Sequence, residues 1–209
     1  HTPFGHAGQD ALNECMKDYG GFEHNLQSLW VVDFLEGRYA KWDGLNLSFE
    51  TREGILKHCS RKNAEKLGPL GERFLKGHQP SLEAQLANFA DEIAYNNHDL
   101  HDGLRAELFS TDEIAELPLL KGCFATVDVL YPGLNYYRRR HEALRRFFGV
   151  LVEDVIAVAQ ENLAQLAPQN VIDIRHAGRP MVRFSDPVGP ILKPYGHFCL
   201  SGCTAPRRW

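Results

Sequence analysis

A long run of apolar residues at helical spacing between residues 141 and 167 constrains the fold more than any other feature of the sequence. Most of these side chains recur every three or four residues, which places them on one side of an α-helix. They are Leu144, Phe148, Leu151, Val155, Val158, Leu163 and Leu166. A helix of this length needs other helices or a sheet to cover its apolar side.

Shorter segments repeat the helical pattern, so the expected fold class is all-α. The clearest of them begins at Pro80 and Ser81, where the Ser81 hydroxyl can cap the first turn, and is expected to end near Tyr95. Residues 1–8 predict a loop, Gly20 and Gly21 a corner, and residues 60–79 a polar surface excursion. The other predicted helices cover residues 9–17, 22–35, about 46–56, 100–109 and 111–120.

The pattern changes after Pro168. Residues 171–174 favour a short strand or an extended link, and prolines and glycines follow up to Trp209. We therefore expect a helical core over residues 1–167 and an extended or irregular segment over residues 168–209.

Composition narrows the class of protein. The chain has 209 residues, which suits a single globular domain, and no stretch approaches the ~20 apolar residues that span a bilayer. The five cysteines are widely spread and have no metal-ligand spacing, which predicts reduced thiols in a cytoplasmic protein. The formal charge of -4 argues against a general nucleic-acid binder.

Histidines and carboxylates are the candidates for chemistry. His1 and His6 flank a turn that contains Pro3 and Gly5, and His24 follows the glycine corner. Imidazole can bind a metal or transfer a proton, although a surface or packing role is the commoner outcome for any one histidine.

Asp91, Tyr95 and Asp99 are spaced by four residues, which keeps them near one face of a helix. Asp91 falls among Phe89, Ala90, Ile93 and Ala94, where a buried carboxylate would need a metal or a cation. A capping or salt-bridge role is the competing interpretation.

Four motifs in this order resemble the bacterial deoxyguanosine triphosphatase-like family of HD-domain phosphohydrolases. They are His1-Thr2-Pro3-Phe4-Gly5-His6-Ala7-Gly8, Gly21-Phe22-Glu23-His24-Asn25, Gly44-Leu45-Asn46-Leu47-Ser48 and the segment from Ala90 to Asp99. The resemblance extends from His1 to about Ser185. It implies a helical HD-domain fold, hydrolysis of deoxynucleoside triphosphates to deoxynucleoside and inorganic triphosphate, a divalent metal (Mg²⁺, Mn²⁺ or Co²⁺) and a homo-oligomer.

The resemblance also implies roles for individual residues. Asp91 matches a metal ligand, while the family's other ligands, a histidine and a His-Asp pair, would precede His1, so we expect an N-terminally truncated chain. His6 and His24 match catalytic or pocket histidines, and His1 a further pocket position. Tyr95 and Asp99 match positions near the sugar and phosphates of the substrate.

Two departures from the family pattern affect these expectations. Gln9 stands where many relatives have glutamate, and an amide cannot relay a proton. The chain from about Pro187 does not continue the helical, basic pattern of the family, which suggests a frameshifted or non-native end.

Two other functions stay open at the level of sequence. A non-catalytic nucleotide-binding or assembly module would agree with Gln9 and with missing ligands. The basic residues from Arg138 to Arg146 could contact triphosphate, an effector nucleotide, a neighbouring subunit or single-stranded nucleic acid, with a solvated helix start as the plainer interpretation.

Overall fold

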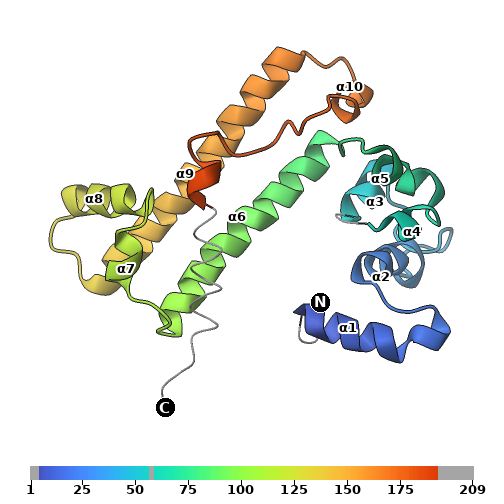
Figure 1. Ribbon diagram of the computed structural model, residues 1–209, viewed down its shortest axis with the longest axis horizontal. Helices are drawn as coiled ribbons and strands as arrows, with labels where there is room; N and C mark the ends of the chain where they lie inside the picture. The colour runs from blue at the N-terminus through green and yellow to red at the C-terminus, as the bar shows by residue number, and fades with distance from the viewer. Residues whose placement is uncertain (1–4, 57–58, 193–209) are drawn as a thin grey trace. The chain divides into compact units, whose positions relative to one another are not determined.

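The computed structural model describes residues 5–56 and 59–192, and every regular element in that part of the chain is a helix (Figure 1). The predicted all-α class is confirmed, whereas the HD-domain topology stays a prediction. The chain forms two compact units, each of which is discontinuous in sequence. Unit 1 contains the described residues up to Gln85 together with Pro168–Arg179, and unit 2 contains Leu86–Ala167 and the described residues from Pro180 on.

Unit 1 begins with helix α1, Gly5–Cys15, followed by the 3-10 turn η1, Lys17–Tyr19. The predicted loop was therefore wrong from Gly5 on, because the helix starts four residues before Gln9. Gly20 and Gly21 form the predicted corner with φ values of 100° and 81°, which side-chain-bearing residues rarely adopt.

The predicted helix over residues 22–35 is present as two parts. Helix α2, His24–Trp30, continues directly into the π-helix η2, Val31–Leu35. The loop after η2 approaches that helix closely at Gly44. A Cβ atom at this position would lie 2.2 Å from the Asp33 carbonyl carbon, so only glycine fits. Helix α3, Phe49–Ile55, then begins at Ser48, whose hydroxyl accepts from the Thr51 backbone N–H at 3.3 Å.

Residues 60–79 are helical rather than the surface excursion that their polarity suggested. They form α4, Arg61–Ala64, the 3-10 turn η3, Gly68–Gly71, and α5, Glu72–Lys76. Leu70 joins Leu29 and Leu56 in a buried cluster, so a few well-placed apolar residues are enough to fix these short helices.

The return segment of unit 1 is also helical. Helix α10, Val171–Arg175, starts with a capping box in which the Asn170 side chain accepts from Ile172 N–H and the Asp173 side chain accepts from Asn170 N–H. The predicted strand or extended link at residues 171–174 was wrong, because this local capping satisfies the first turn of a helix. The division predicted after residue 167 stays a prediction.

Helix α6, Leu82–Arg105, starts where predicted, with the Ser81 hydroxyl accepting from Ala84 N–H at 3.3 Å. It extends ten residues beyond the predicted end at Tyr95 and includes the first part of the helix that was expected over residues 100–109. Leu100 is fully buried and Leu104 is 6% exposed, so the apolar face simply continues along the same helix.

Unit 2 is completed by α7, Thr111–Ala115, α8, Leu120–Leu130, and α9, Tyr136–Leu166. The long helix α9 was predicted, whereas α8 was not. In Figure 1, α8 lies beside the first half of α9, and the two helices are in contact. Phe124 and Val127 of α8 and Leu144 and Phe147 of α9 are buried.

The last described residues contact α9 and α6. Asn162 donates to the Met181 carbonyl at 2.9 Å, and Asp154 accepts from Ser185 N–H at 2.9 Å. Phe184 meets Phe89 of α6 edge to face, with ring centroids 5.4 Å apart. The unusual tail noted beyond Pro187 lies largely outside the described residues.

None of the described helices combines the length and the apolar character that crossing a bilayer requires.

Candidate functional site

His24 is the predicted site histidine whose surroundings are best defined. It is the first residue of α2, and the Glu23 carboxylate before it caps that helix by accepting from Asn25 N–H at 3.1 Å and Leu26 N–H at 2.9 Å. This position aims the His24 ring back toward α1, where Gln9 lies one turn beyond Gly5.

Gln9 and Glu23 hold the His24 ring from two sides. The Gln9 Oε1 atom accepts from His24 backbone N–H at 3.2 Å and contacts His24 Nδ1. Glu23 Oε1 lies 3.1 Å from the same ring nitrogen. Both oxygens are acceptors, so the proton of a neutral His24 ring lies on Nδ1 and its Nε2 atom is the basic nitrogen.

A polar pocket of about 520 Å³ opens beside this arrangement in unit 1. Gln9 and Glu23 line it, together with Trp30 from α2 and two lysines from α4 and the turn after it, Lys62 and Lys66. Carboxylate, amide, aromatic and ammonium groups therefore face one space.

Two residues of the predicted face of α6 interact with each other. Tyr95 donates a side-chain hydrogen bond to Asp99, one helical turn away. Burial and the neighbouring Asp102 raise the pKa of the Asp99 carboxyl, and the hydrogen bond from Tyr95 and the charge of His98 partly offset that rise.

Asp91 does not have the apolar surroundings that its neighbours in sequence suggested. Asp91 is exposed, while Ile93 is only 3% exposed. Two positions along a helix are separated by ~200°, so Ile93 turns to the core when Asp91 turns to solvent. The argument from the cost of burying Asp91 was wrong, although an exposed carboxylate is still able to bind a cation.

The described residues do not form a metal site by themselves. Across residues 5–56 and 59–192, no group of three or more histidine, cysteine, aspartate or glutamate side chains could hold an ion. A bound divalent metal takes several such ligands, so Asp91 can contribute only one to a site that other residues complete.

Two of the predicted site residues, His1 and His6, have no described side chain. His1 precedes the described residues, and His6 lies in α1 with its side chain outside them. His24 belongs to unit 1, and Asp91, Tyr95 and Asp99 belong to unit 2. The sequence did not indicate the link from Gln9 to His24, because the two residues are 15 positions apart and no pattern joins them.

Comparison with known proteins gives a consistent result. A protein of Jannaschia sp. (strain CCS1) is 60% identical over 196 residues, which cover 89% of this chain and 48% of that protein. A protein of Ralstonia nicotianae is 58% identical over 188 residues, covering 90% of this chain and 48% of its own length. Both are named deoxyguanosinetriphosphate triphosphohydrolase-like proteins, as is a relative from Roseobacter denitrificans that is 59% identical.

The chain thus spans about half the length of the curated relatives it matches. No family model matches it.

Proposed function

We propose that this chain, a homologue of deoxyguanosinetriphosphate triphosphohydrolase-like proteins, is part of a hydrolase that cleaves deoxynucleoside triphosphates into deoxynucleoside and inorganic triphosphate. The observation that carries the proposal is the identity of 58–60% with those proteins over about nine-tenths of the chain. A random match cannot give identity of this level over 188 residues or more.

The proposed reaction breaks the bond between the α-phosphorus and the 5′ oxygen of the nucleoside, and water supplies the new oxygen on phosphorus. A divalent metal would stabilise the charge of the triphosphate, with Asp91 as one ligand. With Gln9 and Glu23 both at Nδ1, the Nε2 atom of His24 is the nitrogen proposed to act as a base or a hydrogen-bond acceptor. His6 is proposed as the second histidine of the reaction.

The face of α6 is proposed to meet the substrate. Tyr95 is 65% exposed, so its ring is available to a sugar, while its hydroxyl already orients Asp99. A carboxyl with a raised pKa can donate to, or avoid repelling, an anionic substrate better than an ordinary one. This pair supports a binding role rather than a metal-binding role for Asp99.

The test uses the product of the complete gene with each deoxynucleoside triphosphate and Mn²⁺, Mg²⁺ or Co²⁺. Separation of inorganic triphosphate from diphosphate and phosphate by ion chromatography identifies the bond that is cleaved. We expect triphosphate to be released and the activity to disappear in chelator. Full activity in chelator, or release of phosphate or diphosphate alone, would contradict the proposal.

Asp91→Asn is the first variant prediction. We expect the rate of triphosphate release to fall by at least about 100-fold, because even groups that only support a metal ligand contribute 10–100-fold. Glu92→Gln, which removes the adjacent exposed carboxylate of the same helix, is the matched control and should retain the activity. Equal activities of the two variants would remove Asp91 from the site.

A further inference from the structure

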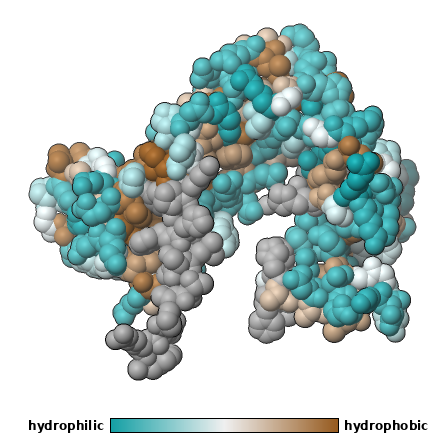
Figure 2. All heavy atoms as spheres, viewed as in Figure 1, coloured by the Kyte–Doolittle hydropathy of each residue, from teal (hydrophilic) through white to brown (hydrophobic). Residues whose placement is uncertain are grey.

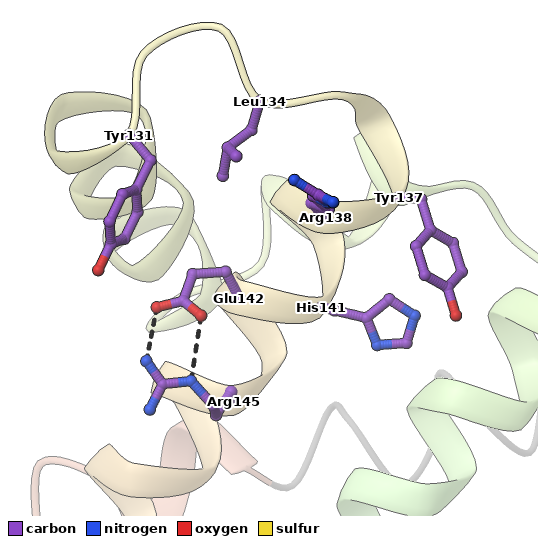
Figure 3. A pocket seen from close by; sticks show the side chains of 7 residues that line it. All are labelled: Tyr131, Leu134, Tyr137, Arg138, His141, Glu142 and Arg145. Atoms are coloured by element: carbon purple, nitrogen blue, oxygen red, sulfur yellow. Dashed lines mark hydrogen bonds and ion pairs between the residues drawn. The ribbon is translucent and has the colours of Figure 1, made fainter.

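A second pocket lies in unit 2, at the start of α9, and none of the residues proposed for hydrolysis lines it. Its volume is about 370 Å³. The lining comes from the end of α8, the connecting turn and the first turns of α9: Tyr131, Leu134, Tyr137, Arg138, His141, Glu142 and Arg145 (Figure 3). Pockets of this size accept small organic molecules.

Aromatic side chains flank this pocket. Figure 3 shows Tyr131 on one side, Tyr137 on the other and Arg138 between them. The Tyr137 ring is already held, because the His141 ring lies 4.2 Å from it and the Arg140 guanidinium lies 5.5 Å from its centroid. A ring fixed in this way can stack on a flat ligand without losing much conformational entropy.

Among the residues that line the pocket, the charged side chains leave one cation in excess. Both Glu142 carboxylate oxygens accept from Arg145, at 2.6 Å and 3.1 Å, so this pair is neutral. Arg139 is held by Asp128 through two bonds of 2.6 Å and 2.8 Å. Arg138 is different: within the described part of the chain its guanidinium has no acidic partner.

Exposed apolar residues directly precede Tyr131 of the pocket lining in the chain. Val129 is 80% exposed and Leu130 52% exposed at the end of α8, where Figure 2 shows apolar residues on the surface. An unpaired guanidinium between aromatic rings and apolar groups favours a ligand that has both a flat ring and an anionic group.

We propose that this pocket binds a nucleoside monophosphate, with the base against the tyrosine rings and the single phosphate on Arg138. One unpaired guanidinium matches one phosphate group, since an arginine fork binds a phosphate through two parallel hydrogen bonds. The small volume suits one base rather than a strand of several. This site is separate from the proposed hydrolytic residues and does not depend on them.

Calorimetric titration of the complete protein in chelator tests the proposal, because it measures binding without hydrolysis. GMP and AMP are the probes, with guanosine and inorganic phosphate as the two halves of the ligand. We expect each monophosphate to bind more tightly than either half. Failure of the hydrolysis experiment would not change this result, since no turnover is measured.

Four variants locate the binding. Arg138→Gln should weaken GMP binding at least about tenfold, as expected for the loss of a charge-assisted pair. Tyr137→Leu should weaken it several-fold, whereas Tyr137→Phe keeps the ring and should bind normally. Arg105→Gln removes an exposed arginine of the same unit outside the pocket and should have no effect.

Three outcomes would overturn the proposal. These are no heat of binding with millimolar GMP, equal affinity of Arg138→Gln and the unaltered protein, and binding of guanosine as tight as that of GMP. Tighter binding of GTP than GMP that is equally lost in Arg138→Gln would overturn the assignment to a single phosphate.

Discussion

Gln9 shows how a single side chain can change the chemistry available to its neighbour. Its amide oxygen accepts from both the backbone and the ring of His24, and an amide does so without adding charge. A glutamate at this position would place a second negative charge beside the ring. The Glu23 carboxylate lies 3.1 Å from the same ring nitrogen, so one amide and one carboxylate together hold the His24 ring.

The pH dependence of stability follows from a second histidine. His141 Nδ1 lies 3.1 Å from His101 Nε2, and burial, then His101 and Arg140, lower the pKa of His141 from 6.5. The folded chain therefore binds fewer protons than the unfolded chain as pH falls through 6.5 toward the lowered pKa. We predict that the free energy of unfolding decreases over this window.

Urea denaturation at several pH values between 7 and 5 measures this effect. His141→Phe removes the titrating ring, so its free energy of unfolding should depend less on pH across the same range. Gln160→Ala, an exposed change on the same helix, should keep the slope of the unaltered protein. Equal slopes for His141→Phe and Gln160→Ala would refute this assignment.

At the scale of elements, the strength of the apolar pattern decided what the sequence could predict. The faces of α6 and α9 are long and regular, so both helices were expected, although the end of α6 was placed too early. The short helices from α4 to α5 are mostly polar, and Leu70 anchors them by packing with Leu29 and Leu56, which are distant in sequence. Such tertiary contacts leave no local pattern to read.

Site prediction had the same limits. The shared face of Tyr95 and Asp99 follows from helix geometry and was predicted, whereas the exposure of Asp91 depends on which face meets the core. The pairing of His101 with His141 joins two helices, so sequence spacing could not indicate it. The basic run at the start of α9 was predicted as a candidate contact surface, but the sequence did not indicate that Arg139 and Arg145 form ion pairs.

Two glycines, one in the η3 turn and one in α8, allow the packing of these elements to be tested. A Cβ at Gly71 would lie 1.9 Å from the Ala64 carbonyl oxygen, so Gly71→Ala must force the two turns apart. We expect a loss of about 2 kcal/mol or more in the free energy of unfolding, within the range for overpacking. A Cβ at Gly122, inside α8, would have no neighbouring atom within 4 Å, and Gly122→Ala should stabilise by about 0.5–1 kcal/mol.

Thermal and urea denaturation of the two glycine variants provides the comparison. Similar stability of Gly71→Ala and the unaltered chain would show that the contact between the η3 turn and α4 is looser than the structure indicates.

At the scale of the whole molecule, a buried ionic cluster connects the beginning of the chain with its return segment. Glu53 of α3 is 1% exposed and accepts from Arg175 of α10 at 2.6 Å. Arg73 of α5 approaches the same carboxylate at 3.5 Å and donates to the Leu56 carbonyl at 2.6 Å. Three helices of unit 1 therefore depend on one carboxylate.

Glu53→Gln should destabilise the protein by about 3–5 kcal/mol, because it leaves the buried Arg73 and the largely buried Arg175 without a counter-charge. Glu50→Gln alters an exposed carboxylate of the same helix and should change the free energy of unfolding by less than about 0.5 kcal/mol. Urea denaturation followed by circular dichroism measures both. A loss below about 1 kcal/mol for Glu53→Gln would show that the cluster contributes little.

The same cluster has a consequence for how the protein is made. Glu53 and Arg175 are 122 positions apart, so a ribosome that adds about 5–20 residues per second needs roughly 6–24 s between them. During that interval the nascent chain has Glu53 and Arg73 but not the last partner of the cluster. Unit 1 can reach its final ion pairing only after the ribosome has synthesised the whole of α9, and a pause in translation between Glu53 and Arg175 would prolong its incomplete state.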